Sequence, residues 1–158
     1  MNISRLSLGS MERAGGRNSQ QRYTHDFVVD GLSLAKACEA GMRDLVGCID
    51  ALDASMNYRS ISELVMTEGM PKRVQLFECP QCGDIGCGAI TVRIEQREDI
   101  WVWEDFRYEN NYDSSMTVHY PKVGPFYFAA EQYEGLLRGV MDAGLMKTAK
   151  ERKRSKRR

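Results

Sequence analysis

Residues 90–108 read ITVRIEQREDIWVWEDFRY, and this stretch carries the clearest structural pattern in the chain. Apolar and polar residues alternate over Ile90–Glu95 and again over Ile100–Tyr108, with a short polar loop between the two runs. This alternation is typical of strands, so the stretch predicts a β-hairpin. Trp101 and Trp103 share one face of the second strand, and the other face is also apolar. We therefore expect a central strand that is covered on both sides.

Further elements are predicted on both sides of this hairpin. The predicted strands are Tyr23–Asp30, Arg73–Glu78 and, at the far end of the chain, Phe126–Phe128. Apolar residues at helical spacing predict helices near 42–54 and 130–145, and Ser60 caps a shorter one that runs to Glu68. Together they predict an α+β fold, with a mostly antiparallel sheet of four to five strands and two to three helices packed against it.

The length of 158 residues suits one domain with terminal extensions. Residues 1–22 are polar and Gly-rich, which predicts a flexible leader, and 147–158 are a charge run expected to be a disordered basic tail. Residues 23–146 form the predicted single α+β domain. No apolar run is long enough for a membrane span, and no secretory signal is evident. An odd cysteine count without a signal favours the cytoplasm.

The net charge of zero hides an uneven distribution. The tail 147–158 carries eight basic residues and one acidic residue, and the leader 1–22 carries four Arg and one Glu. The remaining segment therefore holds 10 basic against 20 acidic residues, a net charge of −10. Such a surface attracts basic proteins and repels nucleic acid.

Three of the five cysteines lie in the segment 79–87, which reads CPQCGDIGC. The Cys-Pro-Gln-Cys-Gly start is typical of a knuckle that presents two thiolates to a metal. Cys79, Cys82 and Cys87 are therefore candidate ligands for zinc. His119 is a weak candidate for the fourth ligand, and His25 and Asp84 are alternatives.

Two other interpretations of the same cysteines stay open. The pair could be redox-active, although it lies between strands rather than at a strand-to-helix junction. It could also be a structural corner whose glycines allow close backbone approach. Cys38 and Cys48, within apolar segments, are expected to be buried structural thiols.

A second group of candidate residues is acidic and surrounds the tryptophans. The predicted partner-binding residues are Glu98, Asp99, Glu104, Asp105, Glu109 and Asp113. The sequence contains no recognisable catalytic motif, so no catalytic residues are predicted. The leading hypothesis is a non-catalytic cytoplasmic protein-binding module, such as an immunity or antitoxin-type inhibitor of a basic protein. The alternative is a zinc-binding or thiol-redox protein, and nucleic acid contact through Lys147–Arg158 is a weaker third.

Several motifs together resemble a family of small bacterial proteins that are sometimes labelled "oxidoreductase". The motifs are Cys79–Ala89, Val102–Phe106, Tyr108–Asn110, Gly124–Phe128, Tyr133-Glu134 and, near the start, Phe27–Gly31. The resemblance covers roughly residues 23–137. It implies a unified domain and carries over no catalytic residues.

Overall fold

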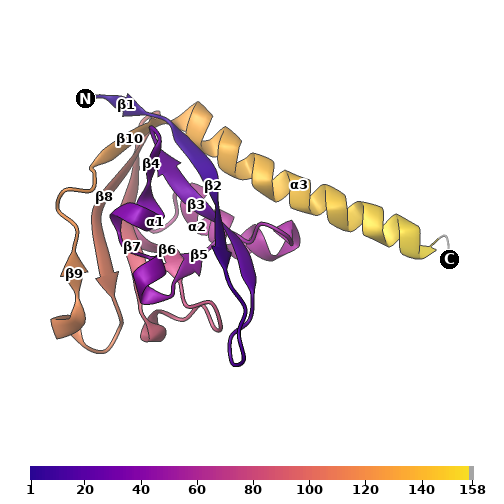
Figure 1. Cartoon of the computed structure of the whole chain (residues 1–158). Helices are drawn as coiled ribbons and strands as arrows, with labels where there is room; N and C mark the ends of the chain where they lie inside the picture. The colour runs from indigo at the N-terminus through magenta and orange to yellow at the C-terminus, as the bar shows by residue number, and fades with distance from the viewer. Residues whose placement is uncertain (157–158) are drawn as a thin grey trace.

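The computed structural model describes the backbone of residues 1–156 and the side chains of residues 1–143. Strands and helices are both present in that part, so the fold is α+β, as predicted (Figure 1). The strands are β1 (Ile3–Ser4), β2 (Leu6–Arg13), β3 (Arg22–Val29), β4 (Leu32–Ser33), β5 (Val46–Gly47), β6 (Lys72–Glu78), β7 (Ala89–Arg97), β8 (Ile100–Glu109), β9 (Val118–His119) and β10 (Phe126–Ala129). The helices are α1 (Leu34–Ala37), α2 (Tyr58–Val65) and α3 (Ala130–Lys156), and the 3₁₀ turns are η1 (Gly41–Arg43), η2 (Ala54–Asn57), η3 (Ile85–Cys87) and η4 (Ser114–Met116).

The strands of the described residues form two sheets. The larger has the order β1-β10-β8-β7-β6-β5, with β9 also paired to β8, and the smaller is β2-β3-β4. Every pairing is antiparallel except that of β1 with β10. The prediction of a mostly antiparallel sheet is confirmed, but four to five strands was too few. Among the strands that were not predicted, β1, β4 and β5 have two residues each, which is too short to show alternation, and β2 lies in the segment that was expected to be a flexible leader.

The two sheets enclose a common core. Backbone bonds join β3 to the chain after β5, from His25 N to Ile49 O and from Ala51 N to Tyr23 O, both 2.9 Å. The chain links the two sheets a second time between β1, which belongs to the large sheet, and β2, which follows it and belongs to the small sheet. The core includes Phe27 from the small sheet and Trp103 from the large one, whose rings pack edge to face at 5.7 Å.

The β7–β8 hairpin is confirmed, with one irregularity that the sequence pattern does not show. Both Trp101 and Trp103 are fully buried. The register shifts between Thr91 and Arg93, and Asp105 takes a left-handed backbone with φ of 58°. Alternation alone would place Asp105 with the tryptophans. The bulge instead leaves Asp105 exposed and brings Phe106 into the core.

The prediction of a helix near 42–54 is wrong. That segment holds η1, β5 and a loop that leads to η2. Leu45, Val46 and Ile49 are buried where the chain pairs with β3 and β6, whereas Met42 and Leu52, which a helix would have placed on the same face, are exposed. Gly47 explains the close pairing, since a Cβ there would lie 1.9 Å from the carbonyl oxygen of His25.

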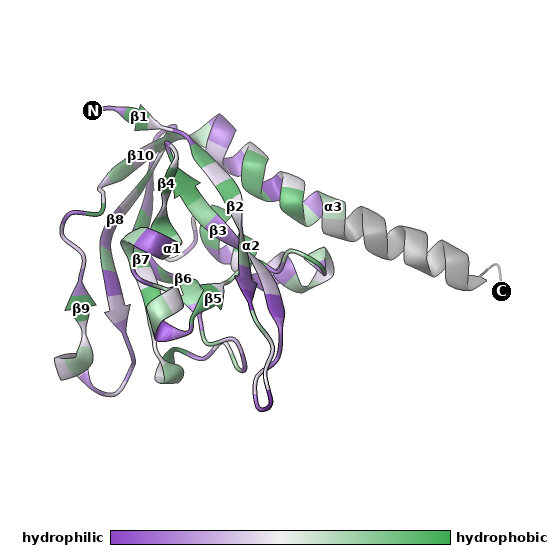
Figure 2. Cartoon of the chain, viewed as in Figure 1, coloured by the Kyte–Doolittle hydropathy of each residue, from purple (hydrophilic) through white to green (hydrophobic). Residues whose placement is uncertain are grey.

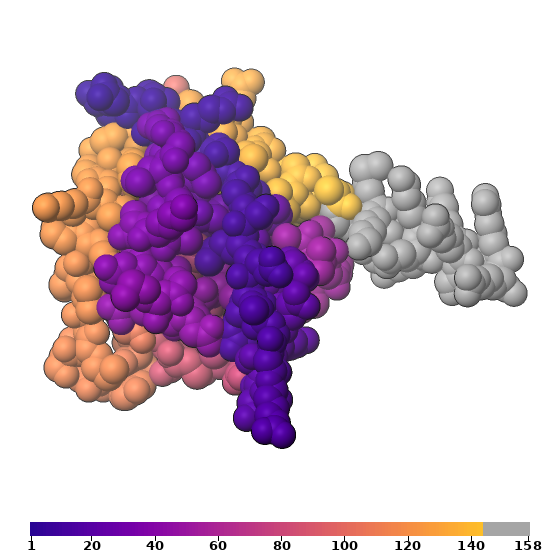
Figure 3. Space-filling view, in the orientation of Figure 1, coloured from indigo at the N-terminus to yellow at the C-terminus, as the bar shows by residue number. Residues whose placement is uncertain are grey.

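The segment 1–22, expected to be a flexible leader, contains the strands β1 and β2 and the first residue of β3. β2 pairs residue by residue with β3 from Leu6 to Arg13, and Leu6 is buried in the core. The β2–β3 hairpin lies across one face of the molecule, and its polar tip projects beyond the body (Figures 2 and 3). Polar composition predicted flexibility because it cannot show that a neighbouring strand supplies the partner.

Helix α3 begins at Ala130, as predicted, and buries Tyr133 and Leu137. It then extends past the body of the molecule to Lys156 (Figure 1). The helix therefore overlaps the segment 147–158 that was expected to be disordered, whose side chains lie outside the described residues. Among the described residues, no helix is both long enough and apolar enough to span a bilayer.

Candidate metal centre

The three-cysteine segment connects two neighbouring antiparallel strands. β6 ends at Glu78 and β7 begins at Ala89, so the ten residues between them form a long turn. Its first part is closed by a bond from Gly83 N to Cys79 O, at 2.9 Å. Gly83 has a φ of +67°, a conformation that glycine adopts without strain. The predicted knuckle is therefore present in the backbone.

The turn brings the three sulfurs together. The Sγ atoms of Cys79, Cys82 and Cys87 all lie within 4.8 Å of one another. The Sγ atoms of Cys82 and Cys87 lie 3.3 Å apart. Zinc–sulfur bonds of about 2.3 Å in a tetrahedron would place sulfurs about 3.8 Å apart. The observed spacing lies around that value, so a metal ion could enter with small side-chain movements.

Backbone N–H groups point at the sulfurs, as a thiolate site requires. Burial acts to raise the pKa of Cys79, but the N–H groups of Cys82 and Gln81 lower it, and the net shift is downward. Asp84 N donates to Cys82 Sγ at 3.4 Å. The neighbouring sulfurs raise the pKa of Cys87 to about 11, because hydrogen bonds to Cys82 and Cys79 favour its protonated form. Cys87 is therefore harder to deprotonate than an ordinary thiol.

The turn η3 returns Cys87 to the other two cysteines. The Asp84 carboxylate caps it by accepting from Gly86 N at 3.0 Å. Gly88 ends it with a φ of +94°, and a Cβ there would lie 2.3 Å from the Tyr108 hydroxyl. Tyr108 thus packs directly against the backbone that carries Cys87, and the Arg43 guanidinium stacks 4.0 Å above its ring.

Positive charge lies beside the cluster. A cavity of about 210 Å³ is lined by Cys79 and Cys87 together with Arg13 and Arg43. Arg13 is fixed by Asp44, whose two carboxylate oxygens accept from Nε and Nη2 at 2.8 and 2.9 Å. Cations near thiols favour the thiolate form, which is the form that binds a metal.

The predicted fourth ligands do not join the three sulfurs. Within the described part of the chain, no His, Asp or Glu lies within the 4.8 Å group that the three cysteines form. The His119 side chain is 61% exposed and faces Asp105 at 3.9 Å, while His25 Nδ1 lies 3.1 Å from Gly9 O. Asp84 is occupied as the cap of η3. The described residues therefore leave a fourth coordination position for water or another ligand.

The other two cysteines are buried, as expected. Cys38 is fully buried, and burial raises its pKa to about 12. Burial also raises the pKa of Cys48 strongly. Both are therefore inert thiols at neutral pH.

The six predicted partner-binding carboxylates are not one uniform acidic face. Asp105 is paired with Arg73 and Arg107, Glu104 with Arg93, and Glu109 with Arg107 at 3.6 Å. Asp113 caps η4, and Glu98 and Asp99 form the β7–β8 turn. Arginine side chains therefore neutralise three of the six carboxylates, those of Glu104, Asp105 and Glu109.

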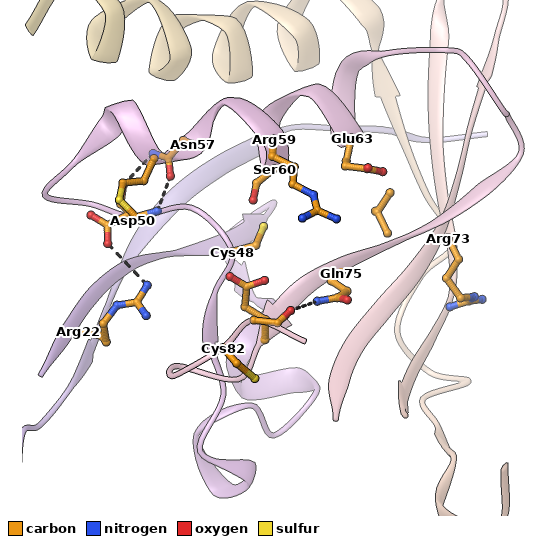
Figure 4. Close-up of a pocket in the computed structure, with 14 residues that line it drawn as sticks. Arg22, Cys48, Asp50, Asn57, Arg59, Ser60, Glu63, Arg73, Gln75 and Cys82 are labelled. Carbon is orange, nitrogen blue, oxygen red and sulfur yellow. Dashed lines mark hydrogen bonds and ion pairs between the residues drawn. The ribbon is translucent and has the colours of Figure 1, made fainter. Parts of the chain in front are cut away.

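A polar cavity behind the knuckle was missed by the sequence prediction. It measures about 450 Å³ and is lined by residues of β3, α2, β6 and the knuckle, Glu78 and Cys82 among them (Figure 4). Burial raises the pKa of Glu78 to about 7, although Arg22 and Arg59 act to lower it. The one available signal was a carboxylate at the end of a strand that directly precedes the cysteine motif.

Comparison of the chain with protein-family models, with curated proteins and with solved structures finds no match. The resemblance to a small bacterial family stays a prediction.

Proposed function

We propose that the protein binds zinc through the thiolates of Cys79, Cys82 and Cys87. The observation that carries this proposal is the mutual approach of the three sulfurs within 4.8 Å. The backbone N–H groups aimed at Cys79 and Cys82 support it, since they stabilise negative charge on sulfur before any metal binds. Thiolate sulfur is a preferred ligand of zinc.

The arrangement has the features of a site with an exchangeable fourth ligand. Structural zinc sites are closed by four protein ligands, whereas sites with three leave a position for water or a substrate. Three thiolates and one zinc ion carry a net charge of −1, and Arg13 and Arg43 at the adjoining cavity offset it. Zinc bound here would act as a Lewis acid toward a ligand in the fourth position.

Metal content and cobalt substitution test this proposal. We expect about one zinc per chain and, in the cobalt form, the charge-transfer absorption of three thiolates. Cys79→Ser, Cys82→Ser and Cys87→Ser should each weaken metal binding, because each removes one ligand. Cys38→Ala is the control, since it removes a buried thiol from the same chain without touching the cluster. Less than 0.1 zinc per chain after reconstitution, or equal binding by all four variants, would refute the proposal.

One observation favours a second function, thiol–disulfide exchange. The 3.3 Å separation of the Cys82 and Cys87 sulfurs suits a disulfide-forming pair. In that reaction the two thiols would become a disulfide and pass two electrons and two protons to a substrate disulfide, which becomes a dithiol. Thiol titration separates the two functions. Rapid loss of two thiols with oxidised glutathione, together with no bound zinc, would favour exchange over metal binding.

The protein-binding hypothesis also stays a prediction. Its support is the excess of acidic residues in 23–146, which would attract a basic protein of the kind that an immunity or antitoxin-type inhibitor neutralises. The internal arginine pairs of Glu104, Asp105 and Glu109 reduce that support. Any nucleic acid contact through Lys147–Arg158 involves side chains outside the described residues.

A further inference from the structure

The cavity behind the knuckle contains a carboxylate that lacks a close partner. Glu78 is half-buried at the end of β6, and it makes no hydrogen bond or ion pair within 4 Å to any described residue. Its oxygens would lie 3.3 and 3.4 Å from a Cβ at Gly83, so the knuckle glycine leaves them room. A half-buried carboxylate without a protein donor is free to accept a hydrogen bond from a donor on a ligand.

Three arginines line the same cavity, and they differ in how they are held. Arg73 is paired with Asp105, at 2.7 Å. Arg22 is fixed, because its Nη1 donates to Pro80 O at 2.5 Å and its Nη2 lies 3.7 Å from Asp50. Arg59, on the first turn of α2, makes no hydrogen bond or ion pair to the described residues. Figure 4 shows its guanidinium reaching from α2 toward β6 across the cavity. Arg59 is thus a cation available to a ligand.

The available charges in the cavity are those of Arg59, Glu78 and Glu63, of which Glu63 is exposed and lies four residues after Arg59 on α2. Glu78 and Arg59 line one cavity, yet no pair of their charged atoms lies within 4 Å. A molecule between them could offer a cationic donor to Glu78 and an anionic acceptor to Arg59. The volume of about 450 Å³ is in the usual range of small-molecule sites, roughly 300–1,000 Å³.

We propose that this cavity binds a small zwitterion of the amino-acid class, with its ammonium group on Glu78 and its carboxylate on Arg59. A simple anion would satisfy Arg59 and leave Glu78 without a donor, while a simple amine would do the reverse. Only a ligand with both groups satisfies both side chains. Neither Glu78 nor Arg59 belongs to the three-cysteine cluster, although Cys82 also lines this cavity, so the proposal does not need a bound metal.

Isothermal titration of the full chain with ω-amino acids tests the proposal and measures the span between the charges. The probes are glycine, β-alanine, 4-aminobutyrate and 6-aminohexanoate, with hexanoate and hexylamine as single-charge counterparts. Titrations are run on the zinc-loaded and the metal-free chain, so that an amine bound at the metal is recognised by its loss with the zinc. We expect one length to bind about tenfold or more tightly than either single-charge probe in both forms.

Three variants identify the residues. Glu78→Gln should remove the advantage of the amine, so that the best zwitterion binds no better than hexanoate. Arg59→Gln should remove the advantage of the carboxylate. Glu68→Gln, an exposed change on the loop after α2, is the control and should bind as the wild type does. Thermal unfolding of each variant checks that it is folded. Binding of hexanoate as tight as that of every zwitterion, or no binding of any probe at millimolar concentration, would overturn the proposal.

Discussion

The indole of Trp103 donates a hydrogen bond from Nε1 to the Tyr133 hydroxyl at 3.2 Å, and that hydroxyl donates to Leu64 O at 2.7 Å. Trp103, Tyr133 and Leu64 are all buried. The relay therefore joins β8, α3 and α2 in the core, and it satisfies polar atoms that have no access to water. By contrast, the Nε1 of the neighbouring Trp101 is buried and has no partner among the described residues.

Tyr133→Phe should destabilise the fold by about 1–3 kcal/mol, because it leaves the Trp103 N–H without an acceptor. Urea unfolding, followed by tryptophan fluorescence, measures the change. Tyr112→Phe removes a hydroxyl from a ring that is 73% exposed, and it should change the free energy of unfolding by less than about 0.5 kcal/mol. Equal effects of the two substitutions would show that the relay contributes nothing.

Leu6→Ala should cost about 2–5 kcal/mol, because Leu6 is 1% exposed and its truncation leaves a cavity in the core. The matched control is Ile3→Ala on β1, where the side chain is 52% exposed. Chemical denaturation of both variants gives the comparison. If Leu6→Ala costs no more than the control, the N-terminal strand is not part of the core in solution.

The elements that sequence predicted well share one property, which is a long run of a single period. The β7–β8 hairpin and the start of α3 each supply at least three repeats of their pattern. The helix prediction for the segment 42–54 failed because its apolar residues fall at helical spacing, although the segment folds as a 3₁₀ turn, a two-residue strand and a loop. In addition, a bulge such as that at Asp105 depends on the register of the partner strand, which local sequence does not contain.

The candidate site was predictable in part for the same reason. Two residues separate Cys79 from Cys82, and a Pro-x-Cys-Gly turn determines their approach locally. Two features bring Cys87 to them. The Asp84 cap is local in sequence, whereas the contact of Gly88 with Tyr108 is made with a residue of another strand, β8. The cavity residues Arg22, Arg59 and Glu78 come from three separate segments, so only the fold brings them together.

Gly88→Ala should destabilise the protein and weaken zinc binding. Its Cβ would lie 2.3 Å from the Tyr108 hydroxyl, and the φ of +94° is unfavourable for alanine. Gly31→Ala separates the two effects, because Gly31 has a φ of +83° and nothing within 4 Å of its Cβ. We expect Gly88→Ala to cost about 1–3 kcal/mol more than Gly31→Ala, and to reduce zinc content where Gly31→Ala does not. Equal stability and equal zinc content of the two variants would contradict the role assigned to the Gly88–Tyr108 contact.

Asp105→Asn should lower the stability of the fold at neutral pH, and this loss of stability should become smaller in acid. The hydrogen bond from Arg107, with the charge of Arg73, holds the pKa of Asp105 below its usual value, against the opposing effect of burial. A carboxyl with a lowered folded-state pKa stabilises fully above its unfolded pKa of about 3.9, and the contribution is lost as pH falls through the folded pKa.

The size of this effect is limited by solvent. The Asp105 side chain is 36% exposed, so we expect less than about 1 kcal/mol at pH 7. Asn tolerates the left-handed backbone at this bulge, so the substitution removes the charge without adding strain. The charged or titratable groups that face Asp105 are Arg73, Arg107 and His119. Urea unfolding of the wild type and the variant is measured from pH 7 to pH 2. The difference between their free energies of unfolding should be constant above about pH 5 and should close below about pH 4. A difference that persists at pH 2 would mean that the carboxylate charge is not its source.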